Sequence, residues 1–122
     1  MDKIMRHMSD TETIIILEST INNCEKMIVK FDSGTSQHSL LKNRIKALLI
    51  SKYVVTKDSL ISDYTTQDIQ SALVPLDSIL HKTTKAIEKH EEGSRTYKRL
   101  IPMIMAISAS KQALQDYLGE NR

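Results

Sequence analysis

The feature that most constrains the fold of this chain is a similarity between its two halves. Residues 17–52 align without gaps with residues 76–111, which lie 59 positions later, and 11 of the 36 pairs are identical. The pair of turn glycines, Gly34 and Gly93, is among the identities, and apolar exchanges extend the register at both ends. We interpret this similarity as an internal duplication, so both halves are expected to fold alike.

Each half has the pattern of two amphipathic helices joined by a short turn. Apolar residues of the first half recur at steps of three and four, at Ile14, Leu17, Ile21, Cys24, Ile28 and Phe31. Ser9 and Glu12 have capping-box spacing, and Gly34 is predicted to be the left-handed residue that ends the first helix. Gly93 repeats that position in the second half. Four helices are therefore expected, at about 10–32, 36–62, 66–91 and 95–118.

Two amphipathic hairpins bury their apolar faces most simply against each other. The predicted fold is thus all-α, a four-helix up-down-up-down bundle made of two duplicated αα-hairpins, residues 9–62 and 66–118. Residues 9–122 form its single domain, and residues 1–8 are expected to be a flexible N-terminal segment or an alternative start at Met8. Pro75 and Pro102 fall inside predicted helices and are expected to kink them.

Charge and composition restrict where the protein works. The net charge of +2 over 122 residues does not favour nucleic-acid binding by the chain as a whole. The single cysteine, Cys24, excludes an intramolecular disulfide and fits a buried thiol in a reducing compartment. The most apolar run, Ile14 to Leu17, is far too short to span a bilayer. A cytoplasmic protein without a membrane segment is expected.

No sequence motif commits the chain to a reaction. A di-iron bundle needs Glu-x-x-His on two helices, and a phosphate-binding Walker loop needs G-x-x-x-x-G-K-[ST]; the sequence contains neither. Cys24 and His38 are the one conceivable nucleophile and base, and the predicted hairpin separates them. The expectation is therefore a non-enzyme with no catalytic residue, no metal site and no cofactor.

Basic residues near the two predicted Gly turns form a candidate anion site. In an up-down-up-down bundle both turns lie at one end, which brings two helix N-termini together. The bases nearest those N-termini are His38, Lys42, Arg95, Lys98 and Arg99. Anion or nucleic-acid binding there is one alternative function, and ordinary surface charge is the simpler interpretation.

Two lysines interrupt the apolar seam at matching positions. Lys52 lies between Leu48 and Val55, and Lys111 occupies the same place in the second half. Either each lysine reaches water from the seam, or it forms a half-buried ion pair, for which the matching carboxylates Glu18 and Asp77 are the candidates. A core lysine pair would allow a third function, an enzyme or small-ligand binder.

The stretch GTSQHSLLKNRIKAL, residues 34–48, resembles a segment of small, uncharacterised all-helical proteins of low-GC Gram-positive bacteria. The resemblance covers about residues 26–52 and implies a bacterial, cytoplasmic, helical protein without indicating an activity. The function expected first is a non-enzymatic binding or regulatory module that contacts another protein or a second copy of itself. Ile50 and Val54, beside the seam at i, i+4 spacing, are the candidate partner face.

Overall fold

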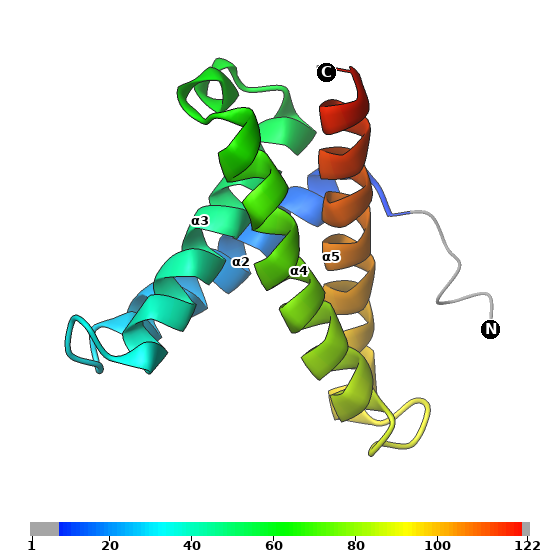
Figure 1. The fold of residues 1–122 in the computed structure, drawn as a ribbon. Coiled ribbons are helices and arrows are strands. Elements are labelled where there is room, and N and C mark those ends of the chain that lie inside the picture. The colour runs from blue at the N-terminus through cyan, green and yellow to red at the C-terminus, as the bar shows by residue number, and fades with distance from the viewer. Residues whose placement is uncertain (1–7, 121–122) are drawn as a thin grey trace.

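The computed structural model describes residues 8–120, and this part of the chain is all-helical, as predicted, with no strand (Figure 1). Its four α-helices are α2 (Asp10–Ile28), α3 (Ser36–Thr56), α4 (Thr66–Ile87) and α5 (Arg95–Glu120). A short 3-10 helix, η1 (Ser59–Asp63), connects α3 to α4. Both α4 and α5 continue through their internal prolines, Pro75 and Pro102. None of the helices in residues 8–120 combines the length and the hydropathy needed to cross a membrane.

The helices pack as two pairs. Helix α2 packs along α3 and α4 packs along α5, while α3 against α4 and α2 against α5 join the first pair to the second. Figure 1 shows the two pairs crossing near their middle and diverging, so that the turn between α2 and α3 and the turn between α4 and α5 lie at the tips of two separate arms. The shared core lies where the pairs cross.

The core is built from the predicted stripes. Leu17, Leu48, Leu76, Ile107 and Leu114 are fully buried, and Leu17 and Leu76 are equivalent under the 59-residue shift. A second, smaller cluster contains Met8, Met105 and Ala106. Met8, at the end of the segment predicted to be flexible or to contain an alternative start, is 8% exposed. Residues 1–7 lie outside the described part of the chain.

Local hydrogen bonds explain why α2, α3 and α4 begin at the predicted residues. The capping box of α2 is confirmed: Glu12 N donates to Ser9 Oγ over 3.1 Å, and Ser9 N donates to Glu12 Oε1 over 3.0 Å. A second capping box, which the sequence analysis did not predict, starts α4 through Thr65 and Asp68. Thr35 caps α3 by accepting a hydrogen bond from the backbone of His38.

The ends of the first and third helices were predicted too late. Helix α2 ends at Ile28 and α4 at Ile87, about four residues early in each case. Gly34 consequently does not end α2. It is the third residue of a tight turn, with φ of 94°, in which Thr35 N donates to Asp32 O over 3.2 Å. A positive φ at the third position is what a type II turn requires and glycine supplies it without strain.

The predicted second helix, 36–62, stops at Thr56 because Lys57 adopts the left-handed conformation, with φ of 57°. Lys57 N donates to Val54 O over 3.2 Å and Asp58 N donates to Tyr53 O over 2.9 Å, which is the Schellman pattern of a helix end. Asp58 then caps η1 by accepting from Leu60 N. The end of α3 was not predicted, because a lysine occupies the left-handed position where glycine is usual.

Candidate functional site

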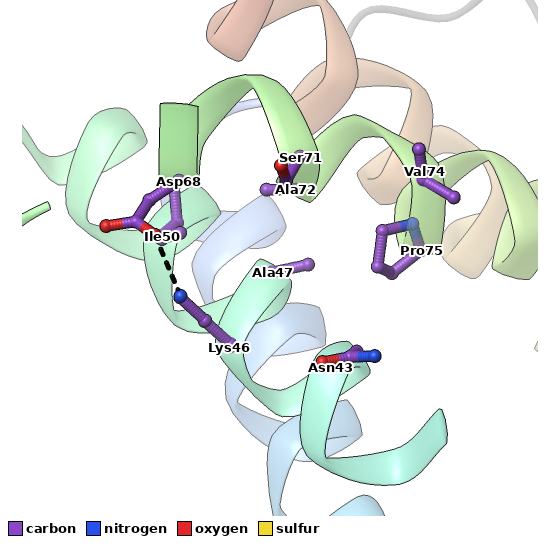
Figure 2. Close-up of a pocket in the computed structure, with 9 residues that line it drawn as sticks. All are labelled: Asn43, Lys46, Ala47, Ile50, Asp68, Ser71, Ala72, Val74 and Pro75. Carbon is purple, nitrogen blue, oxygen red and sulfur yellow. Dashed lines mark hydrogen bonds and ion pairs between the residues drawn. The ribbon is translucent and has the colours of Figure 1, made fainter. Parts of the chain in front are cut away.

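A half-open pocket of about 310 Å³ lies between α3 and α4 (Figure 2). We call it the α3/α4 pocket. Its lining comes from two helices only: Asn43, Lys46, Ala47 and Ile50 from α3, and Asp68, Ser71, Ala72, Val74 and Pro75 from α4. The pocket exists because small side chains face each other across the helix contact. Ala47 and Ala72 are buried there, and neither is long enough to fill the space between the helices.

An ion pair closes one edge of this pocket. Lys46 Nζ lies 2.9 Å from Asp68 Oδ1, as the dashed line in Figure 2 marks. The second carboxylate oxygen, Oδ2, accepts a hydrogen bond of 3.0 Å from Thr65 N at the start of α4. The Thr65 backbone bond, followed by the Lys46 ammonium, lowers the pKa of Asp68 below its usual value. The edge is therefore charged and held in place, while the interior is mostly apolar.

The corresponding place in the other contact between the helix pairs is filled. Under the 59-residue shift, Lys46 corresponds to Met105, Ala47 to Ala106 and Pro75 to Ile16. Met105 and Met8 are each 8% exposed and pack together with Ala106, against Ile16 and Ile101. Methionine side chains of the chain itself thus fill between α2 and α5 the kind of space that stays open between α3 and α4.

An exposed apolar residue adjoins the α3/α4 pocket. Val74 is 71% exposed, although it lines the pocket. Its equivalent in the first half, Ile15, is 59% exposed. Both halves therefore present one aliphatic side chain to solvent at the same helix position, and in the second half it stands beside the α3/α4 pocket.

The predicted partner face is wrong for Ile50. This residue has no exposed surface and belongs to the core, because α3 is covered by α4 and α5 as well as by α2. The prediction placed Ile50 beside the apolar seam of its helix, where surface would remain for a partner. Ile50 instead contributes to the wall of the α3/α4 pocket. Val54 is half-buried and lines a different, larger cavity at the end of α3.

The seam lysines pair with the candidate carboxylates. Lys52 Nζ lies 3.1 Å from Glu18 Oε2, and Lys111 Nζ lies 2.8 Å from Asp77 Oδ1. The lysine side chains are 32% and 34% exposed, so these are half-exposed bridges within each helix pair. They are not cations enclosed in the core. They tie α2 to α3 and α4 to α5, and neither lysine lines one of the two cavities described here.

The five candidate anion-binding residues do not form one cluster. His38 and Lys42 lie at the start of α3, whereas Arg95, Lys98 and Arg99 lie at the start of α5. Figure 1 places these two helix starts at the tips of different arms. The expectation of a shared basic end is wrong because the helix pairs diverge from the crossing point.

The buried thiol agrees with the sequence analysis. Cys24 is a free cysteine, 7% exposed, within the main core cluster. Burial raises its pKa, which the Arg44 guanidinium opposes, so the nucleophilic thiolate is disfavoured. Within residues 8–120, no group of three or more His, Cys, Asp or Glu side chains is placed to hold a metal ion.

The α3/α4 pocket was not predicted from the sequence, although one signal for it was present. The shift of 59 residues sets the charged Lys46 against the apolar Met105 inside the aligned region. Such an exchange indicates that equivalent positions meet different surroundings. Comparison with known proteins adds no assignment: no family model, curated protein or solved structure matches the chain.

Proposed function

We propose that this protein is a non-enzymatic binding module, and that the α3/α4 pocket receives an apolar side chain from a protein partner. The observation that carries the proposal is the contrast between the two contacts that join the helix pairs. One contact is filled by Met8 and Met105, and the other has equivalent backbone positions but an open space. A methionine or leucine side chain of another protein would fill this space.

The pocket has the chemistry expected of such a site. Its interior is formed by aliphatic groups of Ala47, Ile50, Ala72 and Pro75, which favour an apolar side chain. Complete burial of a side chain of this size stabilises an association by about 1.5–3 kcal/mol. The Lys46–Asp68 pair on the edge offers both a donor and an acceptor for the backbone of the same partner.

A protein is favoured over a small molecule because the apolar surface continues outside the pocket. Val74 extends it to the exposed face of α4. A partner could place one side chain in the pocket and a second against Val74, and so contact both apolar surfaces. An amphipathic helix does this with residues one helical turn apart.

The proposal includes the origin of the site. We infer that the chain is a duplicated αα-hairpin in up-down-up-down order, from a bacterial cytoplasmic protein. Equivalent hydrogen bonds support the duplication: Ser51 Oγ donates to Ala47 O over 2.8 Å, and Ser110 Oγ donates to Ala106 O over 2.8 Å. After duplication, divergence at a few positions filled one contact between the hairpins and left the other open.

The test is a selection of displayed peptides against the immobilised protein. Selected peptides are expected to carry a methionine or leucine whose change to alanine abolishes binding. Val74→Asp should lower the affinity for these peptides at least tenfold. The matched control Ile15→Asp, at the equivalent exposed position, should leave that affinity unchanged. Equal loss in both variants, or no selected peptide, would contradict the proposal.

Sedimentation velocity of the protein alone tests whether the partner is a second copy. Concentration-dependent dimers that Val74→Asp dissociates, and Ile15→Asp does not, would identify the occupant as an identical chain. A monomer at all concentrations would leave a different protein as the partner.

A further inference from the structure

A second cavity, of about 610 Å³, lies where α3 ends. We call it the α3-end cavity. Its walls come from the start of α2, the last turn of α3, η1 and the last turns of α5. It forms because the left-handed Lys57 turns the chain away from the axis of α3, so that η1 stands beside the helix and does not extend it.

The interior of the α3-end cavity is largely apolar. Val54 and Ile61 line it, as do Ala109 and Ala113 of α5. The two alanines lie one turn apart on α5, so their short side chains leave a continuous hollow along that helix. Tyr53 adds an aromatic wall, and its ring stands 6.1 Å from that of Tyr64. This surface suits the hydrocarbon part of a ligand.

The same cavity is edged by negative charge. Its carboxylates are Asp10, Asp58, Asp116 and Glu120, and Lys57 is the one cation among the described residues that line it. None of the four carboxylates forms an ion pair with another residue in the range 8–120. This local excess of acid contrasts with the net charge of +2 of the whole chain.

The end of α5 strengthens the negative potential, whereas Asp10 and Asp58 lie at the starts of α2 and η1, where a carboxylate is favourable. Asp116 and Glu120 lie in the last turns of α5, where the backbone carbonyls already carry partial negative charge. Carboxylates are unfavourable there, so a cation would relieve repulsion that the protein has in its absence. The hydrogen bonds that Asp116 accepts from Gln112 and Asp58 accepts from Leu60 orient the carboxylates without neutralising them.

From charge complementarity and apolar walls together, we propose that the α3-end cavity binds a hydrophobic organic cation, with its hydrocarbon part against Val54 and Ala113 and its ammonium group near Asp58 and Asp116. The Tyr53 ring adds the aromatic face that quaternary ammonium groups prefer. An inorganic cation would make no use of the apolar walls. This site is separate from the α3/α4 pocket and does not depend on the function proposed for it.

Calorimetric titration with a matched set of probes tests the chemistry. The probes are hexyltrimethylammonium, its head group tetramethylammonium, the neutral 1-hexanol and the anionic hexanesulfonate. Hexyltrimethylammonium is expected to bind at least tenfold more tightly than each of the other three, with an affinity that falls as sodium chloride is added. Equal binding of 1-hexanol or hexanesulfonate would overturn the charge requirement, and equal binding of tetramethylammonium would overturn the apolar one.

Variants then place the ligand. Asp58→Asn and Asp116→Asn keep an acceptor oxygen for their hydrogen bonds. Each should lower the affinity for hexyltrimethylammonium about fivefold. Asp32→Asn, at the distant turn between α2 and α3, is the matched control and should leave the affinity for hexyltrimethylammonium unchanged. Ala113→Leu fills the hollow while keeping every charge, and it should abolish binding. Unchanged affinity in Ala113→Leu, or the same loss in Asp32→Asn, would contradict the assignment.

Failure here is distinguishable from failure of the proposed function. Val74→Asp removes apolar surface at the α3/α4 pocket and leaves the α3-end cavity intact, so it should not alter hexyltrimethylammonium binding. If Val74→Asp lowers the affinity for hexyltrimethylammonium as much as Asp116→Asn does, the probe does not report on the α3-end cavity and the inference is wrong.

Discussion

The contact between α2 and α5 and the contact between α3 and α4 use equivalent positions of the two halves, yet only the first is closed. Met105 fills the first contact with help from Met8, whereas Lys46 turns outward to Asp68 at the second. Several aligned positions differ between the two contacts, among them Met105 against Lys46 and Ile16 against Pro75. The two contacts thus pack differently at aligned positions, and we propose binding at the one that stays open.

The comparison also explains why both contacts are tolerated. The fully buried residues of the main core, such as Leu17 and Leu76, lie at equivalent positions and hold both halves together. The α3/α4 pocket borders this core, since Ala47, Ile50 and Ala72 of its lining belong to the same cluster. The contact that stays open is the one for which we propose binding.

The largest expected effect comes from opening the closed contact. Met105→Ala should lower the free energy of unfolding by about 2–5 kcal/mol, because it removes a buried side chain and leaves a cavity. Lys46→Ala, at the equivalent position, should cost far less, since the Lys46 side chain is 51% exposed. Urea denaturation of both variants measures the difference. Equal losses would mean that the two contacts are packed alike, contrary to the structure.

Closing the open contact should have the opposite sign. Lys46→Met places in the α3/α4 pocket the residue that fills the equivalent space, so the free energy of unfolding should rise by about 1 kcal/mol. The same variant should no longer bind the peptides selected on the unmodified protein. Lys42→Met, on the exposed surface one turn earlier in α3, is the control and should change neither property. A destabilised Lys46→Met protein would show that the pocket cannot accept a methionine.

A smaller effect distinguishes the ends of α3 and α5. Lys57→Gly should stabilise the protein by about 0.5–1 kcal/mol, because glycine adopts the left-handed conformation without strain from a Cβ atom. Asp116 occupies the equivalent position in α5, where the helix continues to Glu120. Asp116→Gly should therefore destabilise by a similar amount. Thermal unfolding of both variants tests whether the two helix ends differ as described.

The smallest effect is a pH dependence confined to the open contact. Since the folded-state pKa of Asp68 is lowered below 3.8, its carboxylate stabilises the fold above that pH, and this contribution is lost as the pH falls toward the folded pKa. Ser9 is the equivalent residue and does not titrate. The amide signal of Thr65 should shift with a midpoint below 3.8. A midpoint at or above 3.8 would show that neither Thr65 nor Lys46 holds the carboxylate.

Helix starts were predictable because single residues determine them. Ser9 with Glu12 forms a hydrogen-bonded cap, and the polar caps Thr35 and Thr65 directly precede α3 and α4. The end of α3 was not predictable, because Lys57 adopts a conformation that its side chain does not favour. The neighbouring backbone hydrogen bonds impose it, and no local pattern signals them.

The sites were predictable only where they depend on one hairpin. The partners of Lys52 and Lys111 follow from the shift of 59 residues, since each bridge joins helices of the same pair. The α3/α4 pocket and the burial of Ile50 depend on how one pair crosses the other. Helical periodicity reports which face of a helix is apolar. It does not report which of several helices covers that face.

The most direct test of the account is a methyl NMR titration with N-acetyl-methionine methylamide, which carries the side chain that fills the closed contact. The methyl signals of Ala47 and Ala72 should shift in a saturable way, while that of Ala106, buried in the α2/α5 contact, should stay in place. Shifts of equal size at Ala106, or no saturable shift at Ala47 and Ala72, would contradict the claim that the two contacts differ in their capacity to bind.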